Sequence, residues 1–419
     1  MQIEVVTIGD ELLLGFTIDT NGAWIARELA ALGITVVRRT SVGDSAIEIA
    51  AGVGEALART GAVVTTGGLG PTSDDVTKPA IARVFGRGMH TDADIVAWLR
   101  ARWTQRGWPG AMPDSNLQQA VVPDGADILA NAHGSAPGIW LEDEQGRWVA
   151  TLPGVPREMR GMFTDQVLPR IRSRLRGAAT VVRSLTVRTS GISESLLSDR
   201  IKALDGLDLE GLALAYLPGW EGVDLRLTAS GLPDDESRAR LARVATALRR
   251  AAGDHVYGED ADDLAAVVLA ALRSSGHRIA VAESCTGGML GARLTAIPGA
   301  SDVVLGGIIA YHDDVKTAHL GVRPETIGLH GAVSEETARE MASGVRARLH
   351  ATVGVGITGI AGPDGGTPEK PVGTVCIAAD VGGTVRSYRA SMVGDRHEVR
   401  LRSAQAALNL VRRILDGLP

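Results

Sequence analysis

The segment RIAVAESCTGGMLG, residues 278–291, decides the fold of the C-terminal part of this chain. It predicts a buried strand over 279–282, a tight polar turn over 283–288 and the start of a helix rich in small residues. A hydroxyl at a strand-to-helix turn faces the carboxyl edge of a parallel sheet, where ligands of open α/β sheets bind. We therefore predict that Ser284 is an acyl-transfer nucleophile, with the first backbone N–H groups of the helix beside it.

Two other interpretations of this turn remain open. Ser284 or Thr286 is a suitable N-cap, which is the commonest role of a hydroxyl at the start of a helix. Cys285 is a second candidate nucleophile, because thiols are intrinsically better nucleophiles, although a lone cysteine is more often a small buried hydrophobic residue. A cysteine amidase predicts that Cys285→Ala is inactive and that a thiol alkylator inactivates the protein.

The composition is that of a soluble globular protein with about three domains. Of the 419 residues, 45% are apolar and 22% are charged, and the net charge is −6 with mixed signs. This balance points to neither a nucleic acid nor an anionic membrane as a partner. The two cysteines, Cys285 and Cys376, fit no disulfide framework and no metal-site spacing. The acidic start and the lack of an apolar run near ~18 residues predict a cytoplasmic protein.

Residues 1–175 alternate strand and helix patterns with short loops. An almost continuous apolar run at 3–8 is typical of a parallel strand that is covered on both faces. The other predicted elements are strands 35–39 and 62–66 and helices 21–32 and 47–58, and Pro156 suits the first turn of a further helix. This alternation predicts a doubly wound α/β domain.

Polar and glycine-rich segments follow the strands of this first domain, at the edge of the sheet where ligands bind. The glycines permit close approach of the backbone to a phosphate, and the carboxylates suit a hard divalent cation and pyrophosphate chemistry. The candidate residues of this site are Asp10, Glu11, Asp44, Gly67, Gly68, Gly70, Asp74 and Asp75. We expect a divalent metal (Mg, Mn or Co) with Asp74 and Asp75 as candidate ligands, although Asp44 and Asp74 are also ordinary cap or turn residues.

Two further regions follow. Residues 178–256 predict a small α+β unit without a phosphate loop or a basic stripe, with the role of a spacer or an assembly surface. Residues 259–419 predict a second α/β domain, in which Ser334 caps a helix over 334–349. The glycine- and proline-rich segment 358–373 is too long for a simple connection, and loops of that length are often functional. The predicted fold is thus two three-layer α/β domains joined by a small α+β domain.

Several motifs together resemble the CinA family of competence/damage-inducible proteins. In the C-terminal region these are AESCTGG, GGIIAYHDDVK, GAVSEETAREMA, TGIAGPDGG and KPVGTV, and in the N-terminal region GDELLLGFTIDTN, TTGGLGPTSDDVT, GSAPG and LPGVPREM. The resemblance implies a C-terminal nicotinamide mononucleotide (NMN) deamidase and an N-terminal domain that is related to molybdopterin-binding domains and has metal-dependent ADP-ribose pyrophosphatase activity. The middle region sits where the family has a KH-like domain, and since it carries no basic stripe, nucleic acid is not expected as a partner.

The resemblance also implies roles for individual residues of the C-terminal domain. A Ser–Lys pair hydrolyses the carboxamide in this family, and Ser284 and Lys316 stand at the matching positions. Tyr311 and Thr358 match residues that orient the pair or hold the oxyanion, and Arg396 matches the arginine on the substrate side, with Arg400 as its alternative. The glycines expected to approach the substrate are Gly287, Gly288, Gly359 and Gly362.

The chemistry is coherent without the resemblance. Serine needs a base beside it to attack an amide, and lysine is a base only when neutral, so we expect its pKa to be lowered by desolvation or a nearby cation. Attack by Ser284 releases ammonia and leaves a nicotinoyl ester that water hydrolyses, and backbone N–H groups of the turn and of the Thr358 loop receive the oxyanion. No cofactor is expected for this reaction.

A second hypothesis is a non-catalytic protein that binds a pterin or nucleotide and acts in competence or DNA damage. The enzyme hypothesis predicts NMN and ADP-ribose as substrates, and a homodimer is expected because enzymes of this kind commonly self-associate.

Overall fold

The computed structural model describes residues 1–175 and 181–418. They form two compact units, one of residues 1–183 with 229–238 and one of residues 184–228 with 239–419. The middle region therefore groups mostly with the C-terminal region, and the three predicted domain boundaries stay predictions. None of the helices in the described residues combines the length and apolar character needed to cross a membrane.

The first unit contains a six-stranded sheet with strand order β2-β1-β3-β8-β7-β6. Its strands, with the separate pair β4 and β5, are β1 (Gln2–Ile8), β2 (Thr35–Val42), β3 (Ala62–Thr66), β4 (Met89–Thr91), β5 (Val121–Pro123), β6 (Asp127–Leu129), β7 (Gly138–Glu142) and β8 (Trp148–Leu152). Strands β2, β1, β3 and β8 are parallel, whereas β7 and β6 are antiparallel to their neighbours. The parallel half of the sheet brings the ends of β1, β2 and β3 to one edge.

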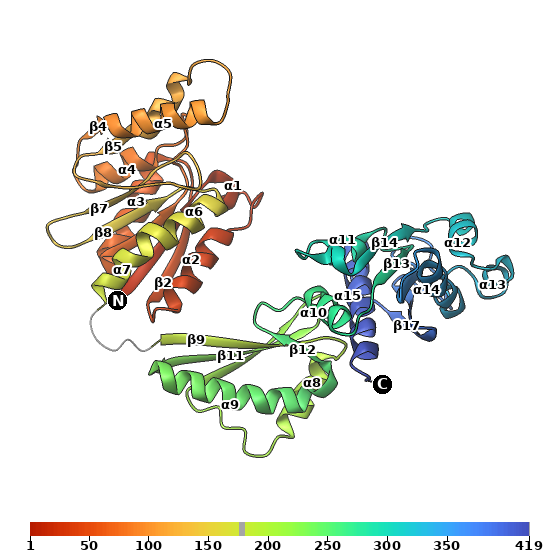
Figure 1. The fold of residues 1–419 in the computed structure, drawn as a ribbon. Coiled ribbons are helices and arrows are strands. Elements are labelled where there is room, and N and C mark those ends of the chain that lie inside the picture. The colour runs from red at the N-terminus through yellow and green to blue at the C-terminus, as the bar shows by residue number, and fades with distance from the viewer. Residues whose placement is uncertain (176–180, 419) are drawn as a thin grey trace. The chain divides into compact units, whose positions relative to one another are not determined.

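Helices cover both faces of this sheet (Figure 1), as the doubly wound prediction requires. The helices are α1 (Asp10–Leu13), α2 (Thr20–Ala30), α3 (Ala46–Thr60), α4 (Thr77–Val84), α5 (Ala93–Gln105), α6 (Pro156–Met162) and α7 (Leu168–Arg174), with short helical turns at Asp114–Ala120 and Phe163–Val167. Ile25 and Met159, on α2 and α6, belong to one core, and Ile49 and Ile81, on α3 and α4, belong to the other. Pro156 is at the start of α6, as predicted.

The middle region forms a four-stranded sheet with strand order β10-β11-β9-β12. Its elements are β9 (Val181–Thr189), α8 (Glu194–Lys202), β10 (Leu212–Pro218), β11 (Val223–Leu232), α9 (Asp234–Ala252), a short turn of helix (Gly253–His255) and β12 (Val256–Glu259). Figure 1 shows α9 running along this sheet. The α+β character expected of this region is confirmed.

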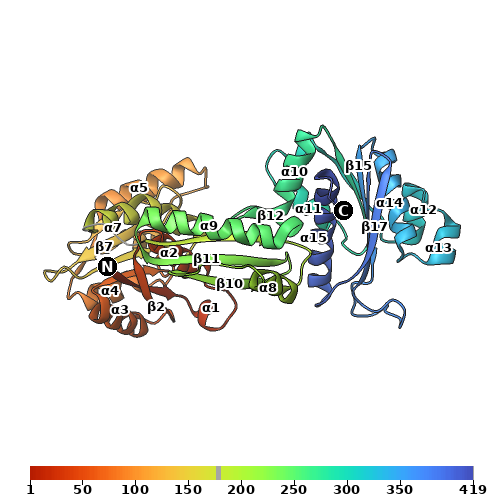
Figure 2. The same cartoon turned by 90° about the horizontal axis from the view of Figure 1, so that it is seen from below.

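The C-terminal region contains a five-stranded sheet with strand order β14-β13-β15-β16-β17. Its elements are α10 (Leu264–Ser274), β13 (Ile279–Glu283), α11 (Met289–Thr295), a short turn of helix (Ala300–Asp302), β14 (Val304–Ile309), α12 (Asp313–Leu320), α13 (Pro324–His330), α14 (Glu335–Arg348), β15 (Val353–Gly359), β16 (Thr374–Val381), β17 (Thr384–Ser391) and α15 (Arg396–Leu415). Figure 2 shows α10, α11 and α15 on one side of this sheet and α12, α13 and α14 on the other. The predicted three-layer arrangement is confirmed here too.

Strand β13 lies inside this sheet, parallel to both β14 and β15. The ends of these three strands therefore meet at one edge, and each is followed by a segment that carries candidate site residues. Strand β15 takes in Thr358 and Gly359, the first two residues of the long glycine- and proline-rich segment, because its antiparallel pairing with β16 continues through them. Thr358 is consequently held in the ladder and is not part of the following loop.

Helix α14 packs against β15 at backbone contact. A Cβ atom on Gly354 would lie 2.1 Å from the carbonyl oxygen of Ala342, and one on Gly356 would lie 2.3 Å from the carbonyl oxygen of Ala338. Any side chain at these two positions would push the helix off the sheet. The two glycines thus set the distance between β15 and α14, and with it the position of the segment that leads into α14.

Candidate functional site

A cavity of about 250 Å³ opens at the carboxyl edge of the C-terminal sheet. This is near the lower end of the range of small-molecule sites, roughly 300–1,000 Å³. Among its lining residues are five of the predicted ones, Ser284, Lys316, Tyr311, Thr358 and Arg396, together with the predicted glycines Gly359 and Gly362. The structure therefore brings together side chains that are up to 112 positions apart along the chain.

Ser284 lies in the turn between β13 and α11 and is 7% exposed. Its backbone N–H donates to the carbonyl oxygen of Ile357 on the neighbouring strand, 2.9 Å away. The N-cap of α11 is Gly288, with no side-chain hydrogen bond, so neither Ser284 nor Thr286 caps the helix. The N-cap alternative is thus wrong, and Ser284 lines the cavity.

Gly287 and Gly288 are not among the residues that line the cavity, although both were expected on the substrate side. Their φ angles are +57° and +93°, which are values that residues with side chains rarely adopt. They make the tight reversal that returns the chain into α11. Their role in this structure is to shape the turn.

Most backbone N–H groups around Ser284 already have acceptors. The carboxylate of Glu283 accepts those of Gly288, Leu290 and Gly291, and the carbonyl oxygen of Ser284 accepts that of Gly287. Among the described residues, the N–H groups of Cys285 and Thr286 have no oxygen acceptor, and hydrogen bonding from them to the Cys285 sulfur acts to lower the pKa of that thiol. Any oxyanion hole in this turn is therefore limited to these two amides, and the start of α11, which we expected to serve there, is taken.

Lys316 projects from the first turn of α12, and its side chain is 2% exposed. Its Nζ lies 3.1 Å from Oδ1 of Asp313 and 3.2 Å from the carbonyl oxygen of Tyr311. Among the hydrogen bonds of the described residues, none joins Nζ to the Ser284 hydroxyl. Ser284 and Lys316 both line the cavity, and the Lys316 amine is held in place by Asp313, one helical turn before it.

Arg396 occupies another wall of the cavity. Its guanidinium donates to the Tyr311 hydroxyl at 2.9 Å and to the carbonyl oxygen of Gly362 at 2.5 Å. Arg400, its alternative in the sequence, instead donates to the carbonyl oxygen of Thr286 at 2.8 Å and does not line the cavity. Arg396 is therefore the arginine that is available to a substrate, whereas Arg400 supports the turn of Ser284.

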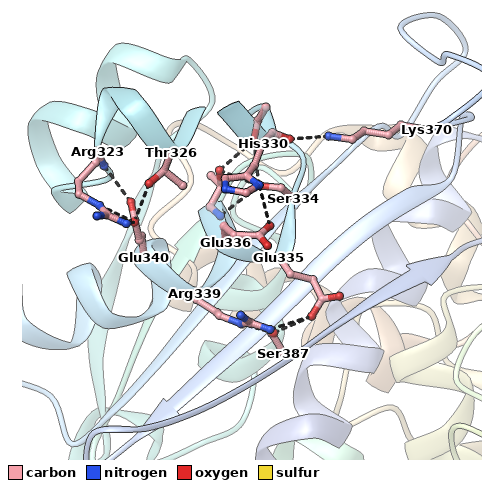
Figure 3. Close-up of polar contacts among 12 residues, drawn as sticks. Arg323, Thr326, His330, Ser334, Glu335, Glu336, Arg339, Glu340, Lys370 and Ser387 are labelled. Atoms are coloured by element: carbon pink, nitrogen blue, oxygen red, sulfur yellow. Dashed lines mark hydrogen bonds and ion pairs between the residues drawn. The ribbon is translucent and has the colours of Figure 1, made fainter. Parts of the chain in front are cut away.

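The Thr358 hydroxyl donates to the carbonyl oxygen of Ala332 at 2.7 Å, so it holds a cavity wall and is already committed. That wall is the segment before α14, and Figure 3 shows how its neighbours are fixed. Ser334 donates to the carbonyl oxygen of Gly331, and Nζ of Lys370, on the long loop, donates to the carbonyl oxygen of His330. Ser334 is also the N-cap of α14, as predicted. The long loop and the α14 entrance are thus tied together beside the cavity.

Cys285 lines the cavity but is buried in the apolar core. Burial raises the pKa of its thiol to about 12, and the charge of Glu283 adds to the effect. A thiol with this pKa is almost entirely un-ionised near neutral pH, and the thiolate is the nucleophilic form. This environment disfavours the cysteine amidase.

We predict that the native protein resists alkylation by iodoacetamide at pH 8, by roughly 10³-fold in rate relative to a free cysteine, because of the smaller thiolate fraction. Intact-mass analysis measures the adducts. Burial also raises the pKa of Cys376, to about 11, so both thiols should react only after unfolding in guanidinium. Rapid modification of Cys285 in the native protein, with loss of activity, would restore the cysteine amidase.

The N-terminal carboxylates gather at the ends of β1, β2 and β3. The N–H of Asp10 donates to the carboxylate of Asp44, and the N–H of Asp44 donates to that of Asp10, at 2.9 and 3.1 Å. Burial raises the pKa of Asp44. The negative charges of Asp10, Glu11 and Asp74 raise this pKa further. The described residues nevertheless hold no group of three or more His, Cys, Asp or Glu side chains arranged to bind a metal ion.

The candidate ligand pair of this domain, Asp74 and Asp75, is not arranged as a metal site. The Asp75 carboxylate accepts hydrogen bonds from the N–H and the hydroxyl of Thr72, at 2.8 and 2.5 Å, and so closes its own turn. Asp74 does not cap α4, whose N-cap is Val76. As they lie, these carboxylates do not fit a preformed metal site.

The glycines of the same loop are required by the packing of the chain itself. A Cβ atom on Gly67 would lie 2.1 Å from the carbonyl oxygen of Ile8, and one on Gly68 would lie 2.1 Å from the Thr77 hydroxyl. Their φ angles are +117° and +64°. Glycine is therefore needed here whether or not a phosphate binds, and the phosphate role stays a prediction.

Family models cover nearly the whole chain. Residues 4–173 match the model described as "Probable molybdopterin binding domain", residues 184–258 the damage-inducible protein CinA KH domain, and residues 261–415 the CinA C-terminal domain. A CinA-like protein of Gemmatimonas aurantiaca is 60% identical over 413 residues, which are 99% of this chain and 96% of that protein. The chain belongs to the CinA family.

Other members of the CinA family are more distant. A competence-damage inducible protein of Moorella thermoacetica is 40% identical over 415 residues, covering 99% of each protein. The solved structure of a competence/damage inducible protein of Agrobacterium tumefaciens is 40% identical, covers 36% of this chain and 93% of its own, and has a TM-score of 0.35. That of a CinA superfamily protein of Klebsiella pneumoniae is 34% identical, with coverages of 37% and 96% and a TM-score of 0.36.

Some residues around the CinA-family cavity were not anticipated from the sequence. Asp313, the partner of Lys316, and Asp364, on the long loop, both line it. Asp313 precedes Lys316 by three positions, which is one turn of a helix, and this spacing was a usable signal. Glu283 and Arg400 support the nucleophile turn from outside the cavity, and no local pattern of the sequence indicates either contact.

Proposed function

We propose that this protein is a nicotinamide-nucleotide amidohydrolase, which converts NMN and water to nicotinate mononucleotide and ammonia. The observation that carries the proposal is the meeting of the Ser284 hydroxyl and the buried Lys316 amine in one cavity, opposite Arg396. A hydroxyl and an amine that is shielded from water form a nucleophile–base pair when they come within hydrogen-bond reach. Membership of the CinA family supports the assignment.

The reaction proceeds in two steps. The Ser284 oxygen attacks the carboxamide carbon while Nζ of Lys316 takes the hydroxyl proton, and the same amine returns that proton to the departing nitrogen, which leaves as ammonia. Water then attacks the ester and restores the serine. Because Nζ now contacts Asp313 and the Tyr311 carbonyl, substrate binding has to bring it onto the hydroxyl. Lysine accepts a proton only in its neutral form, so this contact with Asp313 must loosen.

Arg396 and the backbone amides of Cys285 and Thr286 have the remaining roles in the proposed reaction. Arg396 presents its guanidinium to the cavity and suits an anionic group of the substrate, such as a phosphate. The N–H groups of Cys285 and Thr286 are the donors left for the oxyanion. Tyr311, whose side chain is 61% exposed, fixes Arg396 through its hydroxyl.

The decisive experiment is incubation of the purified protein with NMN, followed by measurement of ammonia and of nicotinate mononucleotide. Equal amounts of both products support the proposal. Binding of NMN without either product favours the alternative, a nucleotide- or pterin-binding protein that does not turn its ligand over. ADP-ribose, with and without a divalent metal, is tested in the same series.

We also propose that the N-terminal domain is a metal-dependent ADP-ribose pyrophosphatase. The observation in its favour is the concentration of negative charge around Asp44, which a divalent cation would relieve. Because the described carboxylates form no metal site as they lie, binding of the cation would have to rearrange them. This second activity is separate from the amidohydrolase, because its residues belong to the other compact unit.

Asp44→Asn is predicted to lower ADP-ribose cleavage in Mg, Mn or Co by at least about ten-fold, the loss typical of a disturbed metal site. A thermal-shift measurement gives a readout that does not depend on turnover: the metal should raise the Tm of the wild type and not of Asp44→Asn. Hydrolysis of NMN by the same variant serves as its control and should be unchanged. A metal-induced shift of equal size in both proteins would contradict the assignment.

A further inference from the structure

Glu283 is a buried carboxylate beside the nucleophile that the proposed reaction does not use. It is the last residue of β13 and is 1% exposed. Within the described residues it takes part in no ion pair. Burying an unpaired charge is costly unless hydrogen bonds compensate for it, so a carboxylate in this place calls for a function.

Three backbone amides bind this carboxylate. Oε2 of Glu283 accepts from the N–H groups of Gly288 and Leu290 at 3.1 and 3.0 Å, and Oε1 accepts from the N–H of Gly291 at 2.8 Å. These are the otherwise unpaired donors at the start of α11, and the positive end of the helix dipole favours the negative charge. The side chain thus closes a loop around the turn that contains Ser284.

Arg400 fixes the other side of the same turn. Its guanidinium donates to the carbonyl oxygen of Thr286 at 2.8 and 3.3 Å. It comes from α15, the helix that also supplies Arg396 to the cavity. The turn is therefore held at two points: Glu283 accepts from its last backbone amides, and Arg400 donates to the carbonyl oxygen of Thr286 in its middle.

We propose that Glu283 is the positioning residue of the nucleophile: its carboxylate gathers the three amides at the start of α11 and so fixes the direction of the Ser284 hydroxyl. The inference rests on the proposed role of Ser284. The negative charge of Glu283 also disfavours ionisation of the neighbouring Cys285 thiol, and this favours the Ser284 hydroxyl as the attacking group. Glu283 touches neither the cavity nor the substrate, so it acts only through the turn.

Glu283→Gln tests the proposal. Alanine would leave three buried amides without an acceptor and endanger the fold, whereas glutamine keeps the shape and one acceptor oxygen. We expect kcat for NMN to fall by roughly 100-fold, the effect of a misplacement near 1 Å, with KM changed by less than about three-fold. We also expect faster amide hydrogen exchange across residues 284–291, measured by mass spectrometry.

Glu340→Gln is the matched control. This carboxylate also accepts a backbone N–H at a helix start, that of Arg323 at 2.9 Å, and the Thr326 hydroxyl donates to it at 2.8 Å (Figure 3). Glu340 does not line the cavity. A loss of kcat in Glu283→Gln alone, with the exchange change, supports the proposal. Equal losses in both variants, or an unchanged kcat or exchange rate in Glu283→Gln, overturn it. If the wild type does not hydrolyse NMN, the proposed function fails, and the exchange measurement still decides whether Glu283 holds the turn.

Discussion

Replacing Ser284 by alanine is expected to lower the rate of ammonia release from NMN by on the order of 10³-fold or more. The hydroxyl is the only part of the side chain that is removed, and its loss leaves the amide carbon without a nucleophile. Water can replace it only poorly, because the remaining groups orient the substrate and not a water molecule. The measurement is a steady-state assay of ammonia at saturating NMN.

The fold should survive this change, since the contact of Ser284 with β15 runs through its backbone N–H, which alanine retains. Cys285→Ala is the comparison that separates the two candidate nucleophiles, and it should keep the rate within about ten-fold, because a side chain that is not the nucleophile contributes mainly packing. Full activity of Ser284→Ala would end the serine mechanism. An inactive Cys285→Ala beside an active Ser284→Ala would establish the thiol instead.

Lys316→Met is expected to cause a loss of similar size, again on the order of 10³-fold or more, because the hydroxyl then has no base. Methionine fills nearly the same buried volume without the amine. The partner left behind, Asp313, is about half exposed and can be hydrated, so the stability cost should be small. Lys316→Arg should not restore activity, since a guanidinium does not accept a proton.

Lys202→Met provides the control for the loss of a lysine charge, because Lys202 is exposed and lies on α8 in the middle region. It should leave the rate unchanged. Circular dichroism and Tm must show that Lys316→Met is folded before its rate is interpreted. A folded Lys316→Met that hydrolyses NMN at the wild-type rate would exclude the amine as the base.

The sequence predicted the backbone elements that carry Ser284, because the signals for these elements are local. The strand, turn and helix start around Ser284 follow from an apolar run, two glycines and small residues, which are features within one short segment. The start of α14 was found for the same reason, since its N-cap lies at its own helix. Lys316 and Thr358, in contrast, were assigned to the site through the resemblance to the CinA family and not through a local pattern.

The contacts that adjust the site were not predictable in this way, because they either join segments that are distant in the sequence or follow no common capping pattern. Arg400 binds a carbonyl oxygen 114 positions away, and its hydrogen-bonding group is identical to that of Arg396, so only the tertiary structure separates the two. The Glu283 side chain accepts hydrogen bonds from the backbone N–H groups at the start of α11, although it lies at the end of β13. These groups are usually capped by a short polar residue at the helix start itself. Thr358 was expected to orient the Ser–Lys pair or hold the oxyanion, but in the extended β15 ladder its hydroxyl donates to the carbonyl oxygen of Ala332.

The backbone contact between α14 and β15 has a consequence for how this domain tolerates change over time. Gly354 and Gly356 let main-chain atoms of the two elements touch, so their spacing is independent of which aliphatic residues fill the layers around them. The hydrogen bond from Thr358, on β15, to Ala332 holds the segment that leads into α14 against the same strand. Substitutions elsewhere in the hydrophobic layers can therefore accumulate without changing the spacing of α14 and β15. The shape of the adjoining cavity wall is then preserved while the core sequence evolves.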